Sequence, residues 1–191
     1  MAERAESLDY AHTAVRQKGL GMATARADLR PPEASESSLR VGTWLMTLAA
    51  IGFIAYATIF LVRNFTDSFL ELGIGQSEVD VSKDQITQFS PSLYHYISHL
   101  HIALSGFIAA TGIAVAFLTW FGVRRGHLWA WVGAVAAPVF ALAVALPAHY
   151  PNHFDTIGHL GLVYLATLIF VVGALLSLKA LLADRNTKSE A

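Results

Sequence analysis

Apolar residues gather in four long blocks along the chain, and none of these blocks contains aspartate, glutamate, lysine or arginine. The blocks cover residues 41–62, 93–123, 129–146 and 158–178. A helix needs roughly 20 apolar residues, at a rise of about 1.5 Å each, to cross the hydrocarbon core of a bilayer. Lipid accepts only helices or closed barrels, and blocks without polar alternation cannot be barrel strands. The pattern therefore predicts an all-α integral membrane protein, a four-helix transmembrane bundle.

The same pattern divides the chain into three parts. Residues 1–40 form a polar arm, predicted to be flexible, and residues 183–191 form a short polar tail. Between them, residues 41–182 form the transmembrane domain, which includes a polar outer loop over 64–90. The four helices are expected over about 41–63, 91–122, 129–147 and 156–182.

Local signals mark the ends and faces of these helices. A serine followed by proline, Ser90-Pro91, predicts the start of the second helix, and Asp155 or Thr156 is a similar cap for the fourth. A small-xxx-small spacing on the second helix, Gly106 with Ala110, predicts that this face packs against another helix.

Lysine and arginine are placed unevenly with respect to the four blocks. Eleven of the thirteen lie in the arm, at the end of the last block, in the tail, or in the turn at Arg124-Arg125. Basic residues favour the cytoplasmic side of a membrane. Both termini and this turn are therefore predicted to be cytoplasmic, with the loops at 64–90 and 148–157 outside. The expected location is the cytoplasmic (inner) membrane of a prokaryote.

Composition narrows the chemistry. Hydrophobic residues make up 54% of the chain and charged residues 14%, well below the roughly 25% that is usual in soluble domains. A formal net charge of −1 offers no basic surface for nucleic acid. The absence of cysteine excludes disulfides, thiolate zinc sites, iron–sulfur clusters, covalently attached c-type haem and cysteine nucleophiles.

Histidines are the most informative polar residues. Eight are present, and six fall at the outer ends of the second, third and fourth predicted helices. Scattered histidines would divide between the two membrane faces, so this grouping indicates a shared role. His95 and His99 are four residues apart on one helix face, and Asp155 and His159 repeat that spacing. The six outer histidines are His95, His99, His101, His149, His153 and His159.

Imidazole and carboxylate ligands suit copper, zinc and iron, and a histidine pair can hold a b-type haem. We therefore predict a transition-metal or b-type haem site at the outer face. His99 and His159 are expected to be its inner ligands, on neighbouring second and fourth helices. His95 and Asp155 would form an outer tier, with Asp155 orienting His159 or binding directly. The predicted metal ligands are His95, His99, His149, His153, Asp155 and His159.

Two other interpretations fit the same histidines: a proton-relay or quinone-facing polar cluster, and a purely structural polar network. The leading functional hypothesis is a metal- or haem-binding subunit of a redox or oxygenase-type membrane assembly. The alternative is a non-catalytic accessory subunit of a larger membrane complex, whose partners are the lipid bilayer and other membrane subunits. A transporter is less well supported, because no charged residue lies mid-membrane in any block.

Overall fold

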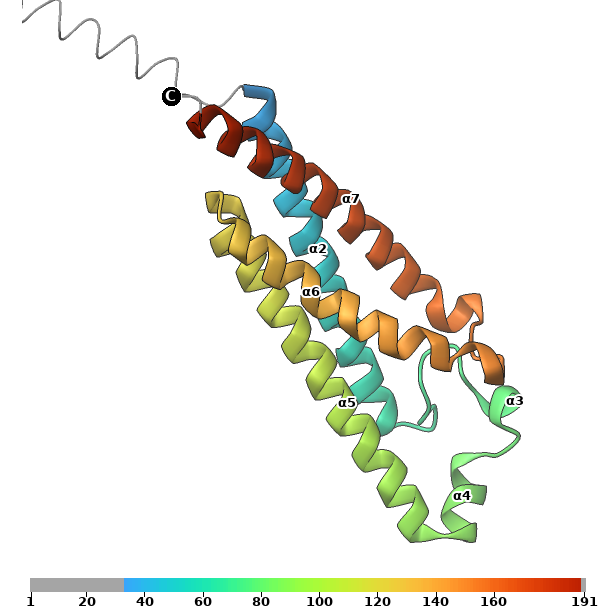
Figure 1. Cartoon of the computed structure of the whole chain (residues 1–191). Coiled ribbons are helices and arrows are strands. Elements are labelled where there is room, and N and C mark those ends of the chain that lie inside the picture. Colours follow the sequence, from blue (N-terminus) through green and yellow to red (C-terminus); the bar gives the residue numbers. More distant parts are fainter. Residues whose placement is uncertain (1–32, 190–191) are drawn as a thin grey trace, which may run out of the picture.

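The computed structural model describes residues 33–189, and their regular elements are all helices (Figure 1). The predicted arm lies outside the described residues except for its end, which is helical. Four helices are long and apolar enough to cross a membrane, which confirms the predicted four-helix transmembrane bundle. The four are α2 (Glu33–Asn64), α5 (Pro91–Phe117), α6 (Leu128–Ala145) and α7 (Ile157–Ser189).

Short elements extend or join these helices. Helix α5 continues through a π-helical turn, η1 (Leu118–Gly122), and a 3-10 turn, η2 (Val123–Arg125). The outer loop contains α3 (Gln76–Val79) and α4 (Lys83–Phe89). Two 3-10 turns follow α6 and lead to α7: η3 (Leu146–Ala148) and η4 (Tyr150–Asn152).

The predicted helix starts are found in the structure. The Ser90 hydroxyl accepts a hydrogen bond from the Leu93 N–H at 3.2 Å, and Pro91 is the first residue of α5. At α7 the cap is Thr156, whose hydroxyl accepts from the His159 N–H at 3.2 Å. Each cap satisfies a backbone donor that the first helical turn leaves without a partner.

Helix α2 is the one on which α5 and α7 both pack (Figure 1). Glycines make these approaches close, because a Cβ atom on Gly42 would lie 2.7 Å from the carbonyl oxygen of Gly173 on α7. On α5, a Cβ on Gly112 would lie 2.7 Å from Cγ1 of Ile54. Small residues let membrane helices gain van der Waals contact that the hydrophobic effect cannot supply between them.

The buried face of α5 is not the predicted one. Gly106 and Ala110 are both exposed, and no atom lies within 4 Å of a Cβ built on Gly106. The buried face instead carries Ser105, Gly112 and Val115. Ser105 and Gly106 point about 100° apart on a helix, so the small-residue stripe faces away from α2.

Two hydrogen bonds join the helices near the end of α5 and the start of α6. The hydroxyls of Thr47 on α2 and Thr119 in η1 lie 3.0 Å apart. The indole N–H of Trp131 on α6 donates to the Ala174 carbonyl on α7 at 3.0 Å. Polar groups inside a membrane need such partners, since lipid offers none.

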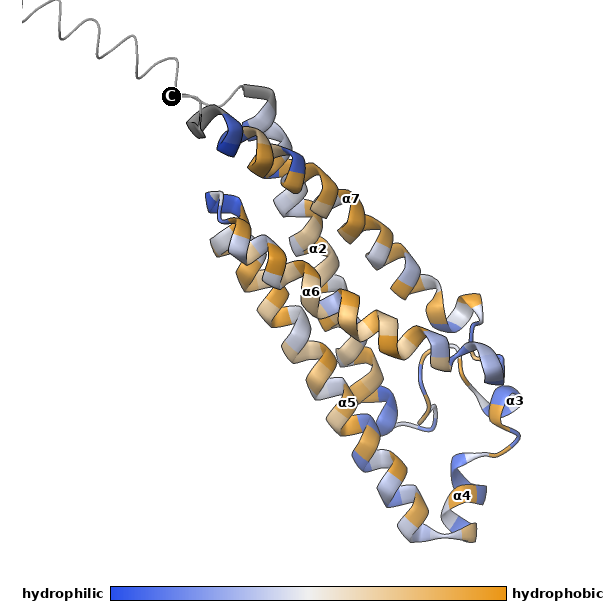
Figure 2. Ribbon diagram, viewed as in Figure 1, coloured by the Kyte–Doolittle hydropathy of each residue, from blue (hydrophilic) through white to orange (hydrophobic). Residues whose placement is uncertain are grey.

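The beginning of α2, the turn after α5 and the end of α7 lie at one end of the bundle. Leu39, Val123 and Leu181 form one apolar cluster there, and the Ser35 hydroxyl donates to the Ala180 carbonyl at 3.3 Å. Polar residues mark both ends of the bundle, and apolar residues dominate the spans between them (Figure 2). The outer loop and the start of α7 lie at the opposite end (Figure 1).

Which end faces the cytoplasm is a prediction that single-cysteine labelling tests directly in this cysteine-free chain. With a membrane-impermeant maleimide on intact cells, Asp84→Cys in the outer loop is expected to react. His127→Cys, in the turn beside Arg124 and Arg125, is expected to react only after permeabilisation. The reverse pattern would invert the predicted topology.

The close contact between α2 and α7 predicts a strong effect of one methyl group. Gly42→Ala is expected to lower the free energy of unfolding by about 1–3 kcal/mol, the usual penalty for overpacking. Gly106→Ala is the matched control, and it should change stability by no more than about 1 kcal/mol, the helix-propensity difference. Thermal unfolding in one detergent measures both, and equal melting temperatures for the two variants would contradict this packing.

Candidate metal centre

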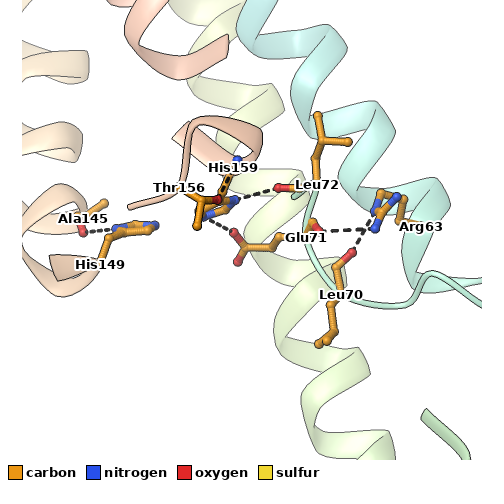
Figure 3. Close-up of polar contacts among 8 residues, drawn as sticks. All are labelled: Arg63, Leu70, Glu71, Leu72, Ala145, His149, Thr156 and His159. Carbon is orange, nitrogen blue, oxygen red and sulfur yellow. Dashed lines mark hydrogen bonds and ion pairs between the residues drawn. The ribbon is translucent and has the colours of Figure 1, made fainter. Parts of the chain in front are cut away.

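The outer loop folds back over the bundle and caps it. Phe69 and Ile74 are buried, with exposed fractions of 1% and 8%. Arg63, at the end of α2, holds the intervening backbone: its Nε donates to the Leu70 carbonyl at 2.9 Å and its Nη2 to the Glu71 carbonyl at 3.3 Å. These bonds place Glu71 toward the start of α7 (Figure 3).

A glycine makes the contact between this loop and α7 possible. Gly73 has φ +75°, in the left-handed region that other L residues rarely adopt. A Cβ atom there would overlap the backbone of Gly158 and the amide nitrogen of His159. Both the conformation and the close approach therefore require glycine, and they bring the Leu72 carbonyl next to the His159 ring.

His159 is almost fully buried, with 2% of its surface exposed. Its Nδ1 lies 2.9 Å from the Leu72 carbonyl oxygen, and its Nε2 lies 3.0 Å from Oε2 of Glu71 (Figure 3). A carbonyl oxygen can only accept, so Nδ1 carries the proton in this bond. Nε2 faces the Glu71 carboxylate, and a proton or a metal ion must lie between these two atoms, because a bare ring nitrogen and a carboxylate oxygen can both only accept.

His149, at the end of α6, is oriented in the same way. Its Nδ1 lies 2.8 Å from the carbonyl oxygen of Ala145, one helical turn earlier, and so donates to it. Its ring lies beside that of His159, with centroids 5.1 Å apart and planes tilted by 31° (Figure 3). Metal-binding histidines usually donate one ring N–H to a carbonyl or carboxylate, which fixes the tautomer and leaves the other nitrogen as ligand.

Three residues thus converge from three separate segments of the chain. One ligand atom each from Glu71, His149 and His159 lies within 4.8 Å of the other two. In a tetrahedral zinc site with bonds of about 2.0–2.1 Å, neighbouring ligand atoms lie about 3.3 Å apart. The three ligand atoms would therefore have to approach one another by about 1.5 Å to bind one ion. Two imidazoles and one carboxylate suit zinc, copper or iron and leave coordination positions open.

The other predicted ligands do not join this group. His95, His99, His153 and Asp155 are all exposed, and none of them is part of it. His101 has a different role, because its ring packs between Phe60 and Phe69, at centroid distances of 4.9 and 5.4 Å.

The structure does not group His99 with His159, for a physical reason. His99 lies on α5, which packs on α2 and not along α7. His159 already has a partner at each ring nitrogen, Leu72 and Glu71, both from the outer loop. Two neighbouring tiers from the second and fourth helices therefore do not form.

Glu71 is the residue that the sequence analysis missed. It lies within the polar outer loop over 64–90, although it stands alone in the apolar run Phe69-Leu70-Glu71-Leu72. Apolar neighbours bury such a run, and a carboxylate buried with them needs a partner. A single carboxylate among apolar neighbours was the signal in the sequence that could have identified Glu71.

Comparisons with protein-family models, with curated proteins and with solved structures give no match. The geometry of the site itself is therefore the basis for the functional inference. What it offers is a half-buried carboxylate and two imidazoles, held where the loop over 64–90 meets the start of α7 in a membrane bundle.

The contact at Gly73 predicts that this loop is sensitive to a single methyl group. Gly73→Ala is expected to loosen residues 69–74, at a cost of about 1–2 kcal/mol for the backbone conformation alone, and to speed their amide hydrogen exchange. Gly75→Ala is the matched control, because φ at Gly75 is −139° and its added Cβ would make only an ordinary contact with Glu78. Equal exchange rates in the two variants would contradict the described contact.

Proposed function

We propose that this integral membrane protein binds one transition-metal ion through Glu71, His149 and His159 at the outer end of its helical bundle. The observation that carries the proposal is the orientation of the two imidazoles. Both donate Nδ1–H to backbone carbonyls, so both keep Nε2 as a potential ligand beside one carboxylate.

The placement of His159 supports the same conclusion. Burying an imidazole and a carboxylate together at the end of a membrane span costs free energy unless each atom is paired. The Arg63 hydrogen bonds and the Gly73 backbone conformation hold Glu71 where it meets His159. Polar groups kept at such a position are usually functional.

The geometry favours a bare ion over b-type haem. A haem held by two axial histidines lies between their rings. The rings of His149 and His159 lie side by side at 5.1 Å between centroids, which leaves no room for a macrocycle between them. Zinc, copper and iron remain as the proposed ions.

The ligand types extend the proposal to a class of chemistry. Two histidines and one carboxylate with open positions are the ligand set of non-haem iron oxygenases, and also of catalytic zinc sites. On this ground we propose that the protein belongs to a redox or oxygenase-type membrane assembly. Redox or oxygenase chemistry requires such an open coordination position on the metal.

A second candidate is an accessory subunit of a larger membrane complex. Helix α6 favours it, because α6 is the least buried of the four spans. Contact with lipid explains the exposure of α6 equally well, so this exposure does not decide between the two candidate functions. Metal binding by the purified protein does. The large exposed apolar side chains of α6 are Trp129, Val132, Val139, Phe140 and Val144.

Metal binding by purified protein tests the proposal. Chelator-stripped protein reloaded with Zn²⁺ or Co²⁺ is expected to retain about one ion per chain. His149→Ala or Glu71→Gln should weaken binding by more than about 100-fold, the upper end of the effect of outer-shell changes. The matched controls are His99→Ala and His153→Ala, which should bind like the parent. Retention in His149→Ala together with loss in His99→Ala would contradict the assignment.

Acid is expected to displace the ion. Imidazole binds metal only when it is neutral, and an ordinary histidine has a pKa of about 6.5. Protons therefore compete with the metal below that value, and affinity should be retained above it. Dissociation constants at pH 7.5 and 5.5 should differ by about tenfold or more. Equal affinity at both values would argue against imidazole ligands.

A further inference from the structure

We infer that the metal centre binds the head group of a single-chain carboxylate amphiphile whose alkyl chain occupies an apolar cavity inside the bundle. This inference rests on the proposed metal site and names the class of ligand for it. The observation behind it is that the three ligand residues line the same cavity as the apolar side chains of all four spanning helices.

The cavity is large and almost wholly apolar. Its volume is about 340 Å³, within the range of small-molecule sites. Among residues 33–189, the titratable side chains along its wall are Glu71, His149 and His159, together with Tyr56. The apolar lining includes Phe53, Leu104, Phe107, Leu142, Val163 and Phe170.

The three candidate ligands, Glu71, His149 and His159, lie at one end of this lining. On α7 it runs from His159 to Phe170, which at a rise of 1.5 Å per residue is about 16 Å along the helix. On α2 it runs from Phe60 to Ala50, about 15 Å. A ligand that matches this wall has one polar end and an extended apolar body.

Charge selects the kind of polar end. A divalent ion held by one carboxylate and two neutral imidazoles carries a net charge of +1. Three protein ligands leave a position open, and bound cations are usually the largest local charges in a site. In apolar surroundings that charge favours an anionic oxygen ligand over a neutral hydroxyl.

The cavity is accessible from the lipid side. Phe107 lines it and is nevertheless 73% exposed, so the wall reaches the outside of the bundle at this point. On α6, Ala141 and Ala145 also line the cavity and are exposed. An amphiphile dissolved in the bilayer could therefore enter sideways, with its chain already in an apolar medium.

The test uses the full chain in phosphatidylcholine nanodiscs, loaded with Co²⁺, with dodecanoate as the probe. Dodecanoate is expected to shift the visible absorption bands of cobalt, because its carboxylate enters the open position. Ala141→Phe fills the cavity without touching a ligand residue, and it should weaken the response at least tenfold while metal retention stays unchanged. Ala143→Phe, exposed on α6 but outside the lining, is the matched control. Dodecanol should respond at least tenfold more weakly than dodecanoate.

The outcomes separate this inference from the proposed function. Retained cobalt with no dodecanoate response, or an equal response in the two phenylalanine variants, overturns the inference and leaves the metal site standing. An equal response to dodecanol overturns the anionic head group. Failure of the parent protein to retain any metal overturns the proposed function and the inference together.

Discussion

The hydrogen bond between His159 Nδ1 and the Leu72 carbonyl is the contact on which the outer end of this molecule depends. It ties the loop to α7, fixes the tautomer of a buried imidazole, and directs Nε2 at Glu71. The loop can reach that position only because Gly73 adopts a positive φ against the α7 backbone. One backbone turn thus joins the closure of the bundle to the chemistry of the site.

The membrane environment of the helices explains this arrangement. The four spans are held together by close glycine contacts and a few interhelical hydrogen bonds. The hydrophobic effect contributes little between them, because an apolar side chain is about as stable against lipid as against another helix. Polar groups therefore stand out against their surroundings. An apolar cavity in the described part of the chain has among its lining the three residues that can share an ion.

The sequence predicted the spans well because bilayer thickness dictates block length, and every apolar block is a helix. The clustering of histidines at one end of the predicted helices also drew attention to His149 and His159, which the structure places beside Glu71. Helix order could not be read, so His99 was paired with a helix on which α5 does not pack. Glu71 was missed because its position depends on a loop conformation that Arg63 and Gly73 hold in place. Neither of these two residues belongs to a periodic pattern in the sequence.

X-ray absorption spectroscopy of the zinc-loaded protein tests the central claim most directly, because it counts the imidazoles on the metal. Two imidazole nitrogens and at least one oxygen are expected at about 2.0–2.1 Å from the zinc. In His149→Ala, any residual bound zinc should show a single imidazole. A shell without imidazole, or one that His149→Ala leaves unchanged, would contradict a site built from Glu71, His149 and His159.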